Sequence, residues 1–239
     1  MTKVTRRERV RATTDHDIRQ HARTLLSAQG QDAVTLRAIA RALGITAPAL
    51  YRYYDSREDL LRQLCDDICT DLSEELTHRS ESVAVDDFAA RVTSTCRGLR
   101  DWALAHPREF TLVFATPPSA SDDSPTVRQD EFAGVFLGLA GPLLAEGAHR
   151  MPTREVPEDL LATVNPHRAA LAEACAAHGL DLGPDDIRPE HVYHLLQWWI
   201  RIYGHVALEV FGRFPFDVRH AEQLFDAMLH DLVRDIDLV

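Results

Sequence analysis

Apolar residues recur at helical spacing along most of this chain of 239 residues. Between residues 14 and 29, Ile18, Ala22 and Leu26 fall on one face of a helix, and Gly30 follows where a C-terminal cap is expected. A second stripe begins after Ser56, the expected cap of the next helix, and comprises Leu60, Leu61, Leu64, Ile68, Leu72 and Leu76. Beyond residue 83 no stretch has the alternation of a strand, so the pattern predicts an all-α protein.

The same pattern divides the C-terminal part into helices and proline-containing loops. The expected helices are 86–106, 129–146, 166–178, 190–211 and 218–233, and 110–114 is expected to begin a further turn or short helix. The expected loops are 116–126, 147–159 and 179–189. The segment 190–211 is apolar nearly all round, which predicts that it is buried on more than one side.

A helical hairpin with a tight turn is expected between Thr35 and Arg57. Thr35 suits an N-cap, Gly44 suits the left-handed residue of the turn, and Thr46 suits a second N-cap with Pro48 behind it. The second helix is short and carries small, aromatic and cationic side chains. Such a helix is typical of a helix-turn-helix, in which it enters the major groove of DNA. The alternative is an ordinary hairpin with buried tyrosines and solvated arginines, but caps, turn and charge together favour the helix-turn-helix.

Charge is distributed unevenly along the chain, whose formal net charge is -11. Residues 1–64 contain 12 Lys and Arg against 7 Asp and Glu, and the remainder contains 14 against 30. The N-terminal part is therefore basic and can approach DNA, whereas an acidic body is repelled by it. Residues 2–12 are rich in arginine and almost free of apolar residues, which predicts a flexible arm that contacts the DNA minor groove or phosphates; a solubilising tail is the alternative.

The segment from about residue 14 to 64 resembles the DNA-binding domain of the TetR family of transcriptional repressors. The positions that carry the resemblance are Thr35, Ala40, Gly44, Ile45, Thr46, Leu50, Tyr51, Tyr53, Tyr54 and Arg57. Tyr53 departs from a frequent His, and Arg57 replaces a Lys that is expected to contact phosphate. The resemblance implies a basic arm over 1–13, a three-helix DNA-binding domain over 14–62, and a helical ligand-binding and dimerisation domain over 63–239.

Within this resemblance, the predicted DNA-binding residues fall into two groups. Those expected to face base edges or the groove are Arg37, Thr46, Ala47, Ala49 and Tyr53. Those expected to hold phosphates are Thr35, Tyr51, Arg52 and Arg57. The partner is then a double-stranded DNA operator.

The segment 190–211 also resembles the C-terminal domain of one TetR subgroup. The matching positions are Trp199, Tyr203, Gly204, Leu208 and Glu209, with Tyr203 in place of a His. This similarity implies a homodimer and a ligand pocket. The predicted dimer interface comprises Gly204, Ala207, Leu208, Phe211, Phe225 and Leu229.

A small-molecule effector is expected to bind among aromatic residues of the body. The predicted pocket residues are Trp102, Phe110, Phe114, Phe132, Phe136 and Trp198. Charges are sparse on those helices, so the predicted ligand is apolar or amphipathic with one or two hydrogen-bonding groups. The alternative is that these aromatics fill a dry core.

Other kinds of site find less support in the sequence. His191, His194 and His205 lack Cys or carboxylate partners at ligand spacing, and Cys65 with Cys69 is typical of two small buried residues, so neither a metal nor a redox pair is expected. No cofactor motif, nucleophile elbow or membrane span is recognisable, which argues against an enzyme and for a cytoplasmic protein. The leading hypothesis is a repressor that a ligand releases from a palindromic operator. The alternatives are a scaffold protein that uses the helix-turn-helix as an anchor and, less supported, an all-α enzyme.

Overall fold

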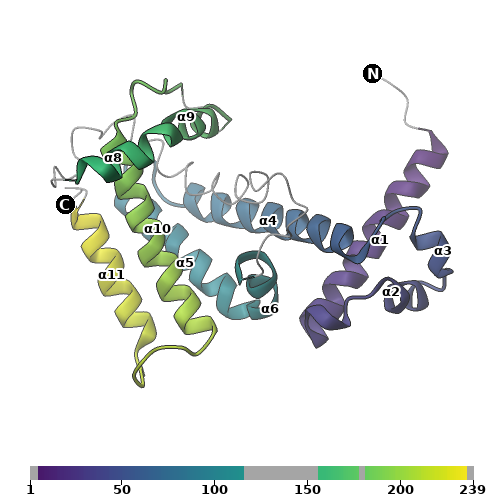
Figure 1. Cartoon of the computed structure of the whole chain (residues 1–239). Coiled ribbons are helices and arrows are strands. Elements are labelled where there is room, and N and C mark those ends of the chain that lie inside the picture. The colour runs from purple at the N-terminus through teal and green to yellow at the C-terminus, as the bar shows by residue number, and fades with distance from the viewer. Residues whose placement is uncertain (1–4, 116–155, 178–180, 236–239) are drawn as a thin grey trace. The chain divides into compact units, whose positions relative to one another are not determined.

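A computed structural model describes residues 5–115, 156–177 and 181–235 (Figure 1). The described residues form helices and turns without a strand among them, which confirms the all-α prediction. They divide into two compact units, each described here by itself. The described residues of the first unit run to Asp71 and resume at His106, and those of the second include Leu72–Ala105 and the segments from residue 156 onward.

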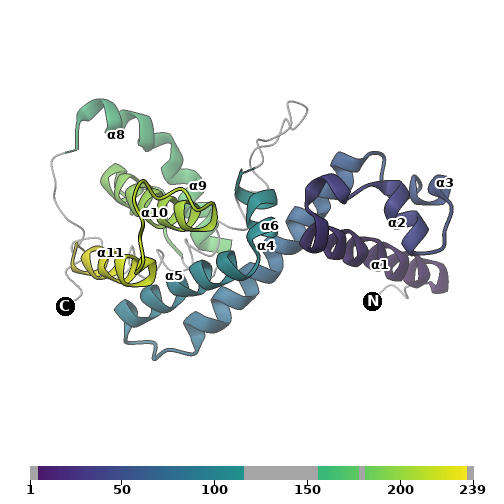
Figure 2. The same ribbon diagram turned by 90° about the horizontal axis from the view of Figure 1, so that it is seen from below.

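The first unit is built around α1, and its core follows the predicted apolar stripe. Its elements are α1 (Arg6–Gln29), η1 (Gln31–Ala33), α2 (Leu36–Ala42), α3 (Ala47–Leu50), the start of α4 (Arg57–Glu81), α6 (Pro107–Phe110) and the π turn η2 (Thr111–Ala115). Ile18 and Ala22 of α1 are fully buried, as are Ile39 of α2 and Leu50 of α3. Helix α1 contacts α2 and α6, and α2 contacts α3 (Figures 1 and 2).

Helix α1 begins at Arg6, so the predicted flexible arm over residues 1–13 is wrong for the residues from Arg6 onward. A capping box explains the early start. The Thr5 hydroxyl accepts from the Glu8 backbone N–H at 3.3 Å, and the Glu8 carboxylate accepts from the Thr5 N–H at 2.7 Å. These first turns need no core contact, because the cap satisfies backbone donors that would otherwise remain without partners. Residues 1–4 lie outside the described part of the chain.

The second unit is organised around its longest complete helix, α10 (Pro189–Val210). Its other elements are the end of α4, α5 (Phe88–Ala105), α8 (Glu158–Val164), η3 (Asn165–His167), α9 (Arg168–Ala177) and α11 (Ala221–Asp235). Helix α10 contacts α5, α8, α9 and α11, and α11 also contacts α5 (Figures 1 and 2). Contact with four helices confirms that the 190–211 segment is buried on more than one side.

Helix α8 was not predicted, because Pro152 and Pro157 indicated a loop through residue 159. In the structure Pro157 is the N-cap of α8, and Glu158 and Asp159 occupy the first turn, where acidic side chains favour a helix N-terminus. The predicted helix 129–146 and loop 116–126 lie outside the described residues.

Candidate nucleic-acid interface

Two short helices and the turn between them form the predicted hairpin. The Thr35 hydroxyl accepts from the Ala38 N–H at 3.1 Å, and Gly44 has a φ of 66°, in the left-handed region that favours glycine. The Ile45 N–H donates to the Ala40 carbonyl at 3.0 Å and so closes the end of α2. Both the Thr35 cap and the Gly44 turn are confirmed. Thr46 is the N-cap of α3 in backbone conformation, but its hydroxyl makes no capping hydrogen bond.

None of the nine predicted DNA-binding residues of this hairpin is fully buried. Arg37, Thr46, Tyr51 and Arg52 are exposed, and the remaining members of the two predicted groups are half-buried: Thr35, Ala47, Ala49, Tyr53 and Arg57. Tyr51 is 55% exposed, a large fraction for an aromatic side chain in a folded protein. The hairpin thus presents cationic, hydroxyl and aromatic groups on a rigid support. Contact with a duplex remains a prediction for each of them.

Tyr54, one of the positions that carry the resemblance but not one of the predicted DNA-binding residues, fixes the end of α3. Its side chain is fully buried, and its hydroxyl donates to the Asp15 carboxylate of α1 at 2.7 Å. Burial raises the pKa of Tyr54, and the hydrogen bond to Asp15 raises it further. Arg19 of α1 binds the same Asp15 and also Asp67 of α4, at 2.5 Å from Nε to the carboxylate oxygen. One polar network therefore joins α1, the end of α3 and α4.

Arg57, predicted to contact phosphate, is turned toward its own chain. Its Nε donates to the Val34 carbonyl at 2.7 Å, and its Nη2 donates to the Gln31 carbonyl at 2.6 Å. Its Nη1 lies 3.9 Å from the Glu58 carboxylate. Arg57 thus binds the turn that precedes α2.

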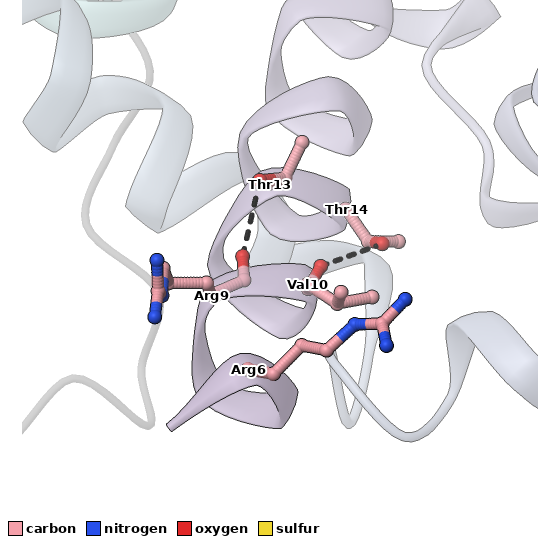
Figure 3. Close-up of a pocket in the computed structure, with 5 residues that line it drawn as sticks. All are labelled: Arg6, Arg9, Val10, Thr13 and Thr14. Atoms are coloured by element: carbon pink, nitrogen blue, oxygen red, sulfur yellow. Dashed lines mark hydrogen bonds between the residues drawn. The ribbon is translucent and has the colours of Figure 1, made fainter. Parts of the chain in front are cut away.

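The first turns of α1 place further cations beside the hairpin. The Arg11 guanidinium lies 5.8 Å from the centre of the Tyr53 ring, within the range of a cation–π contact. An open hollow on the same turns is lined by Arg6, Arg9, Val10, Thr13 and Thr14 (Figure 3). The hydroxyls of Thr13 and Thr14 donate to backbone carbonyls four residues earlier, and the two arginines extend away from the helix (Figure 3).

A buried ion pair joins α1 to α6 within the first unit. Glu109 is 3% exposed, and its two oxygens accept from Nε and Nη2 of Arg23 at 3.0 and 2.9 Å. The Ser27 hydroxyl donates to the same carboxylate at 3.2 Å, and Arg108 donates to the Ser27 carbonyl at 2.7 Å. Sequence reasoning missed this pair, because a glutamate two residues after Pro107 gives no sign of a partner 86 residues earlier.

The six predicted pocket residues are divided among the first unit, the second unit and the residues outside the described part of the chain, so the pocket stays a prediction. Phe110 and Phe114 belong to the first unit, where their ring centres lie 4.9 Å apart. Trp102 and Trp198 belong to the second; Trp102 is buried, and Trp198 packs against a cluster of α9 and the segment before α10. Phe132 and Phe136 lie outside the described residues.

The six predicted interface residues differ in exposure. Leu208 and Phe211 are 38% and 39% exposed, whereas Phe225 and Leu229 of α11 are buried inside the described protomer. Phe225 packs against His205 of α10 at 5.0 Å between ring centres. Gly204 and Ala207 are half-buried, and their spacing places them on the same side of α10 as Leu208 and Phe211. The predicted interface stays a prediction for all six residues.

Buried polar groups of the second unit gather around α10. Arg100 of α5 donates two hydrogen bonds to the Glu209 carboxylate, at 2.8 and 2.6 Å, and His205 Nε2 lies 3.7 Å from the same carboxylate. Burial lowers the pKa of His205, while Glu209 opposes that shift. Burial also raises the pKa of the Cys96 thiol to about 12, which keeps it protonated.

In the part of the chain that the structure describes, no group of three or more His, Cys, Asp or Glu residues could hold a metal ion. Among these same residues no helix combines the length and the hydropathy that crossing a membrane requires.

Comparison with known protein families gives two matches along the chain. Residues 18–64 match the family described as bacterial regulatory proteins, tetR family. Residues 92–232 match the family described as tetracyclin repressor-like, C-terminal domain. The second match alone covers more than half of the chain, and the first contains the hairpin.

Several curated sequences and solved structures are similar to nearly the whole chain. The HTH-type transcriptional regulator Rv1816 of Mycobacterium tuberculosis (strain ATCC 25618 / H37Rv) is 28% identical over 232 residues, which cover 97% of this chain and 95% of that protein. Mb1846 of Mycobacterium bovis, also an HTH-type transcriptional regulator, matches to the same extent. The crystal structure of SCO4313 has a TM-score of 0.70 and 26% identity, over 96% of this chain and all of that one. A protein from Rhodococcus sp. RHA1 shares the fold, with a TM-score of 0.57, 18% identity and coverage of 92% and 93%.

Proposed function

Because this chain belongs to the TetR family of bacterial regulatory proteins, we propose that it is a homodimeric repressor, released from a palindromic operator by a small apolar or amphipathic ligand. It is a DNA-binding transcriptional regulator, and the family and its relatives are regulators rather than enzymes. We assign DNA binding to α1, α2, α3 and the start of α4, as far as residue 62, and ligand binding and dimerisation to residues 63–239.

The observation that carries the DNA-binding assignment is the exposed surface of the capped hairpin. Arg37, Tyr51 and Arg52 project from it while Ile39 and Leu50 hold it on α1. Arg6, Arg9 and Arg11 extend the same basic surface along the first turns of α1. Phosphate contacts from such arginines supply affinity, and groove contacts from α2 and α3 supply sequence preference.

An exposed apolar stripe on α10 supports the homodimer. Leu196, Ile200 and Leu208 are 45%, 52% and 38% exposed, and they follow one another at helical spacing on the side that ends at Phe211. Leu224 of α11, which α10 contacts, is 47% exposed. A second copy of the chain is the proposed partner, because a two-fold axis would pair each stripe with its own counterpart.

The ligand assignment rests on the C-terminal domain and its aromatic residues. Trp102 and Trp198 both lie within the matched segment 92–232. A ligand that binds one conformation of this domain more tightly would change the separation of the two hairpins of a dimer, which must match successive major grooves ~34 to 36 Å apart. Compounds that raise the melting temperature and release the operator would identify the ligand, and Trp198→Ala should weaken that response.

Selection of bound duplexes from a random library tests the DNA-binding assignment. The wild-type chain should enrich an inverted repeat. Arg37→Ala should relax the preference at a cost of ~1 to 3 kcal/mol, whereas Arg219→Ala, a control on a side chain outside the hairpin, should change nothing. Enrichment of no sequence by the wild-type chain would favour the scaffold alternative.

Sedimentation tests the homodimer. The wild-type chain should sediment as a dimer at micromolar concentration, and Ile200→Glu should give monomers, because it places a charge in the proposed interface. Val85→Glu is the matched control, since Val85 is 84% exposed and belongs to the loop between α4 and α5 rather than to α10. A wild-type monomer would refute the proposal.

A further inference from the structure

Arg57 stands at the start of α4 but binds the backbone that leads into α2. Its guanidinium donates to the Val34 carbonyl at 2.7 Å and to the Gln31 carbonyl at 2.6 Å. Val34 is fully buried, and the next residue, Thr35, is the N-cap of α2. The two hydrogen bonds therefore hold the η1 turn and fix the point at which α2 begins.

The geometry leaves few N–H donors of the Arg57 guanidinium available to bind a phosphate. Nε and Nη2 both donate to carbonyls of the same turn, and Nη1 lies 3.9 Å from the Glu58 carboxylate. An approaching phosphate would meet that negative charge and would have to displace charge-assisted hydrogen bonds already formed. Arg52, which is exposed at the end of α3, carries no such contact with the η1 turn.

The position of α2 matters because the exposed Arg37 lies two residues beyond the Thr35 cap. Helix α2 also packs against α3, so a displaced α2 N-terminus would displace both helices of the hairpin. Contacts with base edges tolerate a displacement of this kind poorly, because each bidentate contact depends on direction as well as distance. Contacts with phosphates tolerate it better, since much of their energy is Coulombic.

We propose that Arg57 is a positioning residue, which fixes the N-terminus of α2 through the Val34 and Gln31 carbonyls and so sets sequence preference without binding DNA itself. This inference rests on the DNA-binding function proposed above. It differs from the phosphate contact that the sequence predicts at this position.

Lysine separates these two roles, because it keeps the positive charge but lacks the planar fork that spans two carbonyls. If Arg57 bound a phosphate, the contact would survive in Arg57→Lys and be lost in Arg57→Ala. The loss in Arg57→Ala would flatten the slope of log K for DNA binding against log salt concentration by about 0.9. A positioning contact would be lost in both variants, with the slope unchanged. A role in stability alone would lower the melting temperature of both variants but leave the operator preference of the folded protein intact.

The experiment measures binding of the full chain to the selected operator and to an unrelated duplex over a range of salt concentrations. We expect Arg57→Lys and Arg57→Ala each to lower the ratio of operator to unrelated-duplex affinity at least about fivefold, as for the loss of one base contact. Unrelated-duplex affinity and the salt slope should stay at wild-type values. Arg52→Ala is the matched control and should weaken both duplexes alike and flatten the slope. A wild-type ratio in Arg57→Lys, or a flattened slope in Arg57→Ala, would overturn the proposal.

Hydrogen exchange without DNA gives a second, independent test. The Val34 N–H donates to the Gln31 carbonyl and the Ala38 N–H to the Thr35 hydroxyl, so both amides should exchange faster in both variants. Amides of α11 should be unaffected. Unchanged exchange at Val34 and Ala38 would refute the positioning role even if operator binding failed, whereas a wild-type chain that prefers no duplex would refute the proposed function instead.

Discussion

Removing Arg23 should destabilise the first unit strongly, because it leaves the Glu109 carboxylate buried without its cation. Arg23→Met keeps the length of the side chain but removes the guanidinium. Glu109 is 3% exposed and loses both of the Arg23 hydrogen bonds, at 3.0 and 2.9 Å. The hydrogen bond from Ser27 remains.

The size of the effect follows from burial on both sides of the pair. Breaking a buried ion pair by removing one partner costs ~3 to 5 kcal/mol. The Arg23 side chain is 23% exposed, and the Ser27 hydroxyl still donates, so the lower end applies. We therefore expect a loss of about 3 kcal/mol in the free energy of unfolding of the first unit. Replacing both partners, in Arg23→Met with Glu109→Leu, should cost less than Arg23→Met alone, since no buried charge remains.

Urea unfolding followed by circular dichroism at 222 nm measures these changes, because the described chain is helical. Arg97→Met is the matched control: its pair with Asp226 is exposed on both sides, at 52% and 37%, and should contribute less than ~1 kcal/mol. The midpoint should move without a change in the slope with urea. Equal losses in Arg23→Met and Arg97→Met, or strictly additive losses in the double variant, would refute the reasoning.

Three further changes test other contacts. Tyr54→Phe removes the hydrogen bond to Asp15 and should lower the free energy of unfolding by about 1 to 2 kcal/mol, measured by the same urea method. Gly98→Ala should destabilise by about 1 kcal/mol net, because its Cβ would lie 2.9 Å from the buried Leu76 while alanine itself favours the helix; a more stable variant would contradict this close packing. Burial lowers the pKa of His205 in the folded state, so at pH values around and below 6.5 this histidine binds a proton more readily in the unfolded chain than in the folded one. The folded state therefore loses stability as the pH falls through that range. His205→Gln should lose less stability than the wild type between pH 7.5 and pH 5.5, and an equal loss would contradict the burial effect.

The parts of the fold that depend on residues close to one another in the sequence could be predicted from the sequence. Thr35 caps a helix through an atom three residues away, and Gly44 permits a turn through its own backbone. The apolar stripes of α1 and α4 indicated the buried faces of these helices, because their period is that of a helix. The capping box of Thr5 and Glu8 was equally local, but the absence of apolar residues favoured a flexible arm instead.

The polar contacts of the site could not be predicted, because their partners are distant in the sequence. Arg57 binds carbonyls 23 and 26 residues earlier, and Arg23 binds a carboxylate 86 residues later. Charge and spacing indicate that an arginine is available, but they do not indicate which acceptor it faces. The similarity to a family supplied an expectation for Arg57, and the geometry of this chain gives that side chain a different set of partners.

Helix α3 shows why these distant contacts matter for DNA recognition. It has four residues, too few to be stable as an isolated helix, so its position depends on what holds its ends. Leu50 and Tyr54 are fully buried at its C-terminal end, and the Tyr54 hydroxyl is bound by Asp15 of α1. At the other side of the hairpin, Arg57 holds the turn that begins α2, which packs against α3. Tyr54, between α3 and α4, and Arg57, at the start of α4, therefore both restrain the hairpin. A change at either residue should alter which sequence is bound before it alters whether DNA is bound.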